Sequence, residues 1–202
     1  MILDSTDTIC ALSTANGMGA IAVIRVSGME AFGIVSSVFS KKNIADQDSH
    51  TAHFGVIKNN DKLVDEVLIT VFKNPTSFTG EDVVEIACHG SVFIQQEILK
   101  LLLAKGCRLA KPGEFSMRAF ANGKFDLSQA EAISDLISST TEAAHKLAMQ
   151  QMRGGFSEEI NGLREELVNF ASLIELELDF SEEDVEFADR TQLNELLGRI
   201  SK

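Results

Sequence analysis

The first half of the chain alternates short apolar runs with turn residues. Such runs, rich in β-branched residues, predict strands over 20–26, 53–57, 64–72 and 83–88. Asn59-Asn60-Asp61 predicts a hairpin turn between the second and third runs, because Asn and Asp tolerate the left-handed conformation. Two further segments, 29–39 and 91–104, space their apolar residues at helical intervals. The first half therefore predicts an α+β domain, a mixed sheet with flanking helices.

The pattern changes from Asp126 onward. Ser128-x-x-Glu131 matches a capping box and predicts the start of a long helical stretch, which Gly154-Gly155 interrupts. From Phe156 to Leu178 apolar residues recur every three or four positions, so we expect a second amphipathic helix in an α-helical bundle. Residues 192–202 are again helical in pattern and end without a stop signal, which we interpret as the continuation of a longer protein.

Composition indicates a folded protein with reduced cysteines. Hydrophobic residues make up 45% of the 202 positions, and no apolar run approaches the roughly 20 residues of a membrane span. The start lacks the order of a secretory signal, so we expect no membrane association and a cytoplasmic location. Cys10, Cys88 and Cys107 are odd in number and widely spaced, which fits neither a disulfide framework nor a zinc site. Cys88 and His89 are neighbours on a predicted strand and should face opposite sides, which argues against a catalytic pair.

The net charge of −12 is concentrated in the second half. Residues 126–202 carry 6 basic and 17 acidic side chains, against 12 and 13 in residues 1–125. A chain this acidic is a poor RNA binder by itself, because RNA affinity depends on cations that meet phosphates. The acidic run 181–189 lacks the glycine turn of an EF-hand loop and is interpreted as a solvated linker.

Glycine motifs do not indicate a nucleotide site. Gly17-Met18-Gly19 resembles part of a dinucleotide fingerprint, but it leads into a predicted strand where that fingerprint opens a helix. We therefore expect a glycine turn at the rim of a site. Gly123-Lys124 lacks the remaining residues of a P-loop, so the chain as given should not bind GTP in the P-loop manner.

Two charged residues lie in apolar strands and are candidates for binding. Arg25 follows the run AIAVI and either pairs with a carboxylate at the surface or meets an anionic ligand. Glu85 lies within VVEIA, where a carboxylate is costly unless it is paired or hydrogen-bonded. A salt bridge on the sheet face and a ligand-binding role remain open for Glu85.

The segment 111–127, KPGEFSMRAFANGKFDL, is predicted to be a functional loop. It combines a Pro-Gly turn with aromatic and charged side chains, and a long connection of this composition is often functional. The aromatic residues could also anchor the core, and Asp126 could cap the next helix. The relevant side chains are Glu114, Phe115, Arg118, Phe120, Lys124, Phe125 and Asp126.

Four segments stand out in order along the chain: TIxALST from Thr8, GxGAIAVIRVSG at 17–28, NPTSFTGEDVVEIACHG at 74–90, and KPGEFSMRAFANGKFDLSQAEAISDLI at 111–137. Together they resemble the signature segments of the MnmE (TrmE) family of tRNA-modification GTPases. The resemblance covers essentially the whole chain. It implies an N-terminal α+β folate-binding and dimerisation domain at 1–122, similar to the folate domain of the glycine-cleavage T-protein. The first part of a helical domain, 123–202, would follow and end before an inserted GTPase domain that needs potassium and magnesium.

The resemblance also implies a cofactor and partners. The family binds 5-formyl-tetrahydrofolate or a related folate, forms a homodimer, and works with the MnmG protein. Together they build aminomethyl or carboxymethylaminomethyl groups at C5 of the tRNA wobble uridine. The family's folate contacts fall on Arg25, Glu85 and Lys124, and it places no catalytic residue or metal ligand in this part.

Two other functions remain as alternatives. One is a stand-alone folate-dependent aminomethyl transferase, and the other is a scaffold that only dimerises.

Overall fold

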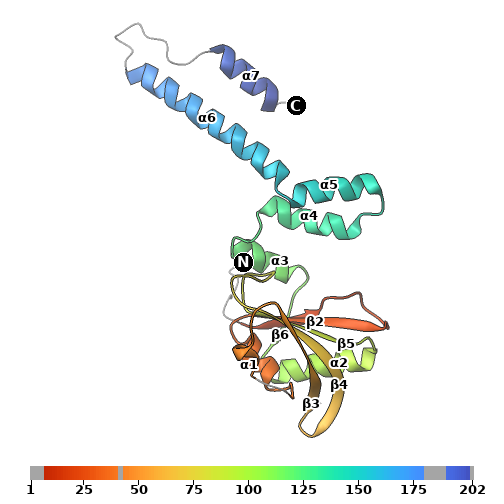
Figure 1. Ribbon diagram of the computed structural model, residues 1–202. Coiled ribbons are helices and arrows are strands. Elements are labelled where there is room, and N and C mark those ends of the chain that lie inside the picture. Colours follow the sequence, from red (N-terminus) through yellow and green to blue (C-terminus); the bar gives the residue numbers. More distant parts are fainter. Residues whose placement is uncertain (1–6, 41–42, 180–189, 201–202) are drawn as a thin grey trace. The chain divides into compact units, whose positions relative to one another are not determined.

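The computed structural model describes residues 7–40, 43–179 and 190–200. The chain divides into two compact units that meet between Phe125 and Asp126. The first unit is a sheet with helices, and the second is entirely helical in its described residues (Figure 1). The predicted fold class, an α+β domain followed by helices, is confirmed.

The first unit is built on a six-stranded mixed sheet in the order β3-β4-β5-β2-β1-β6. All neighbouring strands are antiparallel except β1 and β6, which are parallel. β2 to β5 correspond to the four predicted strands, whereas β1 and β6 were not predicted because each is too short to show a pattern. The strands are β1 (Ile9–Leu12), β2 (Ile21–Ser27), β3 (Thr51–Asn59), β4 (Lys62–Phe72), β5 (Val83–His89) and β6 (Arg108–Leu109).

One face of this sheet packs against α1 (Ala31–Ser36) and α2 (Val92–Ala104), both in predicted helical segments. A short 3-10 helix, η1 (Ile44–Asp46), follows α1. Ile24, Ile69 and Ile86 lie side by side on neighbouring strands with none of their surface exposed, and they form the middle of the core. Because side chains alternate along a strand, the residues that flank each of these isoleucines in its own strand point to the opposite face of the sheet. We call this opposite face the open face.

Two predicted turns are confirmed. Asn60 has a φ of 53° at the tip of the β3–β4 hairpin. Gly17 has a φ of 123°, and the segment after it leads directly into β2 rather than into a helix. Beside it, the Gly19 amide donates to the Gly90 carbonyl oxygen at 3.0 Å. A Cβ on Gly90 would lie 2.3 Å from the Gly19 oxygen, so this close approach requires glycine.

The outer side of β3 is partly covered by the segment after α1. Phe39 forms an isolated β-bridge with Ile57. The Ser40 amide donates to the Val56 carbonyl oxygen at 3.0 Å, and the Lys58 amide donates to the Val38 carbonyl oxygen at 2.9 Å. The β3–β4 register also shifts between Ile57 and Lys58. β3 is therefore an edge strand whose second half is already paired.

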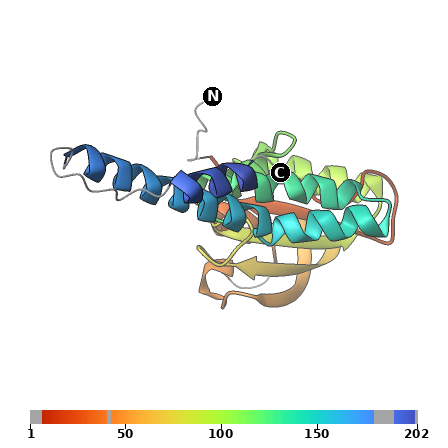
Figure 2. The same cartoon turned by 90° about the horizontal axis from the view of Figure 1, so that it is seen from above.

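The second unit begins with a helical hairpin, α4 (Leu127–Ser138) and α5 (Glu142–Met152), which lie side by side in Figures 1 and 2. The predicted single stretch is wrong, because the chain leaves the helix at Ser139 and Thr141 caps a new one. The predicted capping box is also misplaced by two residues. Asp126 accepts from the Gln129 amide at 2.8 Å, and Gln129 Oε1 accepts from the Asp126 amide at 2.9 Å.

The predicted break at Gly154-Gly155 is confirmed, because Gly154 has a φ of 85° and α6 (Gly155–Asp179) starts immediately after it. The final helix, α7 (Arg190–Ile200), is tied to α6 by an ion pair of 2.6 Å between Arg199 and Glu166. The predicted acidic linker at 181–189 lies outside the described residues. No helix in the described ranges is long and apolar enough to cross a membrane.

Candidate functional site

Arg25 and Glu85 face each other across β2 and β5 on the open face of the sheet. Arg25 donates to Glu85 Oε1 through Nε at 3.0 Å and through Nη2 at 2.7 Å. Their side chains are 20% and 28% exposed, so the pair is partly buried but can still be reached from solvent. The structure therefore contains the salt bridge expected for one interpretation of Glu85, and it leaves the pair accessible for binding.

Aromatic rings surround the guanidinium of Arg25. Its Cζ lies 4.7 Å from the ring centroid of Phe78 and 5.5 Å from that of Phe115. Cations are attracted to the faces of such rings, which helps to hold the arginine in place. Phe78 also contacts Phe125, with ring centroids 5.7 Å apart. The sequence-based prediction included Phe115 and Phe125 but missed Phe78. The feature that could have identified Phe78 is its position in the long connection between β4 and β5.

Lys124 lies against the loop that carries Phe78 and makes no hydrogen bond to Arg25 or Glu85 among the described residues. Its Nζ donates to the Pro75 carbonyl oxygen at 3.0 Å. Gly80 lets this side chain approach, since a Cβ there would lie 3.3 Å from Lys124 Cγ. Of the three predicted site residues, the structure pairs Arg25 with Glu85 directly and connects Lys124 to them through the 73–82 loop.

The segment 111–127 is not the irregular loop that its composition predicted. It contains helix α3 (Glu114–Ala121), which begins after Gly113, with a φ of 74°, and is followed by Gly123, with a φ of 69°. The Pro-Gly turn dominated the prediction, whereas the helix is marked by Glu114 and Arg118, four residues apart. The predicted role of Asp126 as a helix cap is confirmed.

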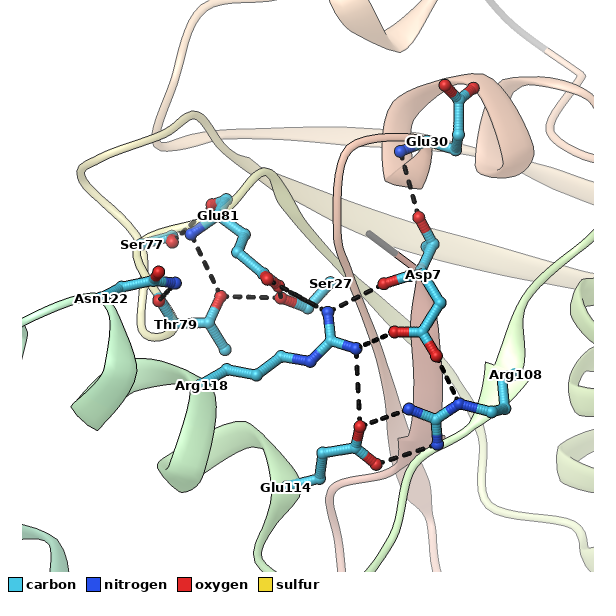
Figure 3. A network of polar contacts seen from close by, with 11 residues as sticks. Asp7, Ser27, Glu30, Ser77, Thr79, Glu81, Arg108, Glu114, Arg118 and Asn122 are labelled. Carbon is cyan, nitrogen blue, oxygen red and sulfur yellow. Dashed lines mark hydrogen bonds and ion pairs between the residues drawn. The ribbon is translucent and has the colours of Figure 1, made fainter. Parts of the chain in front are cut away.

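A buried polar network lies beside this site, centred on Arg118 of α3 (Figure 3). Arg118 is only 2% exposed. Its Nη1 donates to the Asp7 carbonyl oxygen at 2.8 Å and to Glu81 Oε1 at 3.1 Å, while Nη2 contacts the carboxylates of Asp7 and Glu114. Arg108 of β6 bridges Asp7 and Glu114 from the outside. No local pattern in the sequence indicates that these charges are buried together.

The network extends into the 73–82 loop through Glu81. Glu81 Oε2 accepts from Ser27 Oγ at 2.6 Å, and Ser27 Oγ lies 2.7 Å from Thr79 Oγ1. Ser77 Oγ donates to the Glu81 carbonyl oxygen at 2.6 Å. These bonds fix both sides of Phe78.

The hydrogen bond from Arg108 lowers the pKa of Glu114 to about 2, from its usual 4.5. The same arginine, with Arg118, lowers the pKa of Asp7. A carboxylate with a depressed folded-state pKa contributes stability above its unfolded pKa and loses it as the pH falls.

We therefore expect the first unit to lose stability progressively as the pH falls from about 4.5 towards 2. Its three thiols are buried, so their reaction with 4,4′-dithiodipyridine, which proceeds in acid, reports its unfolding in urea. Glu114→Gln removes the titrating group, and its urea midpoint should depend less on pH in this window. Equal pH dependence in both proteins would contradict the assignment.

A second polar cluster lies at the far end of β5. The Asp65 carboxylate, 8% exposed, accepts from the His89 amide at 2.8 Å and contacts His89 Nδ1 at 2.7 Å. Cys88 is buried on the other face, which confirms that it does not pair with His89. All three cysteines are free, as predicted. The described residues contain no group of three side chains suited to hold a metal.

Comparisons with known proteins agree with this architecture. Residues 8–124 match the family described as GTP-binding protein TrmE N-terminus, and residues 127–202 match the MnmE helical domain. Proteins named tRNA modification GTPase MnmE are similar over nearly the whole chain. That of Cytophaga hutchinsonii is 63% identical over 100% of this chain, and that of Flavobacterium johnsoniae is 66% identical over 96%. That of Bacteroides thetaiotaomicron is 56% identical over 97% of this chain.

The match covers only part of each relative. The chain spans 44% of the Cytophaga protein and 42% of the Flavobacterium protein. The two family matches and the identity to these relatives nevertheless indicate the same family along nearly all of this chain. The chain therefore belongs to the MnmE (TrmE) family.

Proposed function

We propose that this chain is the folate-binding and dimerising part of a tRNA modification GTPase. In this proposal it binds a tetrahydrofolate one-carbon donor of the 5-formyl type at Arg25, Glu85 and Lys124. The whole protein, with MnmG as partner, would use the donor to form aminomethyl or carboxymethylaminomethyl groups at C5 of the tRNA wobble uridine. The names of the relatives support the tRNA-modification role and favour it over a stand-alone transferase.

The observation that carries the binding proposal is the geometry of the Arg25–Glu85 pair. Both bonds from Arg25 end on Glu85 Oε1. Glu85 Oε2 makes no hydrogen bond within the described part of the chain, so it can accept one from a ligand. A pterin ring presents adjacent N–H donors that a carboxylate accepts well.

The surroundings of the pair suit the rest of a folate. Phe78 and Phe115 offer aromatic surfaces next to Arg25, against which flat rings can pack. Lys124 uses Nζ to reach one carbonyl oxygen, and an ammonium group carries three donors. It therefore keeps donors for the acidic or carbonyl groups of the ligand.

Dimerisation is proposed through the same open sheet face. Phe54, Leu68 and Ala87 are neighbours across β3, β4 and β5, and Val23 of β2 continues the row. Phe54 is 58% exposed and Leu68 is 43% exposed. An apolar row of this kind on one side of a sheet is suited to burial against a second copy.

Calorimetric titration with 5-formyl-tetrahydrofolate tests the binding site. We expect Glu85→Gln to weaken binding by at least about tenfold, because it removes a charge-assisted hydrogen bond to the ligand. Glu97→Gln is a matched control, since Glu97 of α2 is 27% exposed and is also paired, with Lys100. Equal affinity of the unaltered chain and Glu85→Gln, or no binding by the unaltered chain, would contradict the proposal.

A further inference from the structure

We propose that Arg118 is a positioning residue for the Arg25–Glu85 site. It clamps the 73–82 loop to helix α3, and this clamp places Phe78 and Phe115 against the Arg25 guanidinium. The part of this inference that concerns ligand affinity rests on the proposed folate function. The clamp itself can be tested without a ligand.

Arg118 is linked directly to the 73–82 loop. Arg118 Nη1 lies 3.1 Å from Glu81 Oε1 and 3.3 Å from Oε2. Among the described residues, no other basic side chain contacts this carboxylate. Glu81 is three positions after Phe78 and is bonded to Ser77 and Ser27. A shift of Arg118 would therefore be transmitted to both ends of the short segment that carries Phe78.

Arg118 also shares helix α3 with Phe115. Phe115 lies three residues earlier on the same helix, which is one turn away. Asn122, four residues later, donates from Nδ2 to the Thr79 carbonyl oxygen at 2.7 Å. Arg118 on α3 and Asn122 at its C-terminal cap thus both hold the loop.

The Arg118 network meets the strand that carries Arg25 at Ser27. Ser27 and Arg25 are two residues apart on β2, so they lie on the same face of the sheet. Ser27 binds the carboxylate that Arg118 holds, while Arg25 binds Glu85. The clamp and the proposed binding site are therefore adjacent parts of one surface.

Arginine is specifically suited to this position. Its planar fork reaches the Asp7 carbonyl oxygen and three carboxylates at once, which the single ammonium of lysine cannot do. Its Nε is buried and has no hydrogen-bond partner among the described residues, which is a costly arrangement in a folded protein. The guanidinium therefore keeps this position although one of its N–H groups makes no hydrogen bond to the described residues.

The experiment uses the absence of tryptophan and tyrosine from the chain. Phe78→Trp introduces a single fluorophore into the loop. In this background Arg118→Lys keeps the charge but removes the fork, and we expect red-shifted emission and faster quenching by acrylamide. The buried thiols of the unit should stay protected, which shows that the fold is intact.

Arg108→Lys is the matched control, because Arg108 shares Asp7 and Glu114 with Arg118 but does not contact Glu81. Its emission should stay close to that of Phe78→Trp alone.

Ligand affinity is measured separately in chains that keep Phe78. Arg118→Lys should weaken the binding of 5-formyl-tetrahydrofolate by about tenfold, which corresponds to about 1.4 kcal/mol. Unchanged emission with protected thiols would overturn the clamp. Shifted emission with unchanged affinity would overturn its role in binding. If the unaltered chain does not bind the folate, the proposed function fails, and the emission comparison still decides whether Arg118 positions the loop.

Discussion

Replacement of Arg118 by methionine is expected to lower the free energy of unfolding of the first unit by roughly 3–5 kcal/mol. Methionine fills part of the volume but leaves the carboxylates of Asp7, Glu81 and Glu114 without their shared cation. Glu114 is 3% exposed and the Glu81 side chain 15%, so water compensates little for the loss. The effect should appear as earlier exposure of the three thiols in a urea titration.

Arg108→Met provides the control for this prediction. Arg108 pairs with two of the same carboxylates, but its side chain is 39% exposed. Arg118 stays beside Asp7 and Glu114 when Arg108 is removed, and water partly replaces an ion pair at a side chain this exposed, so the loss of stability should be smaller than for Arg118→Met. A cost below about 1 kcal/mol for Arg118→Met would mean that the buried network is dispensable for folding.

Replacement of Ile86 by alanine is expected to cost roughly 2–5 kcal/mol in the same assay. Ile86 has none of its surface exposed and lies on β5 between Ile24 and Ile69, which are also fully buried. Truncation would open a cavity in the middle of the core, because close-packed neighbours relax only in part.

Ile21→Ala removes the same atoms from the same sheet at a residue that is 68% exposed. Its effect should stay within about 0.5 kcal/mol of zero. Similar costs for the two variants would place the core elsewhere than under α1 and α2.

The fold could be predicted where the sequence has a clear period. β2, β4 and β5 follow from runs of apolar and β-branched residues, and α2 follows from its helical spacing. β6 has only two residues and is defined by its parallel pairing with β1, which no local pattern contains. The same limit explains α4 and α5, since the break at Ser139 depends on a cap at Thr141 rather than on a change in hydrophobicity.

The candidate site was predicted only in part. Arg25 and Glu85 stand out as charges within apolar strands, but it is the resemblance to the MnmE family that implies a ligand role for them. Their pairing depends on β2 and β5 being neighbours despite a separation of 60 residues. In the sequence, Arg118 is one more charge in a polar segment. Its burial follows from the meeting of α3, the start of the chain and the 73–82 loop, which is a property of the tertiary structure.

The covered edge of β3 also affects how the protein behaves at high concentration. A sheet edge with free backbone groups can template the strand of another molecule and so begin aggregation. Here Phe39 and its neighbours pair with the second half of β3, and the opposite edge strand has only two residues. Within the described residues the unit thus lacks a long free edge that would let sheets grow from one copy to the next. Molecules crowded together should meet through their faces, and the first unit should resist conversion into fibrils.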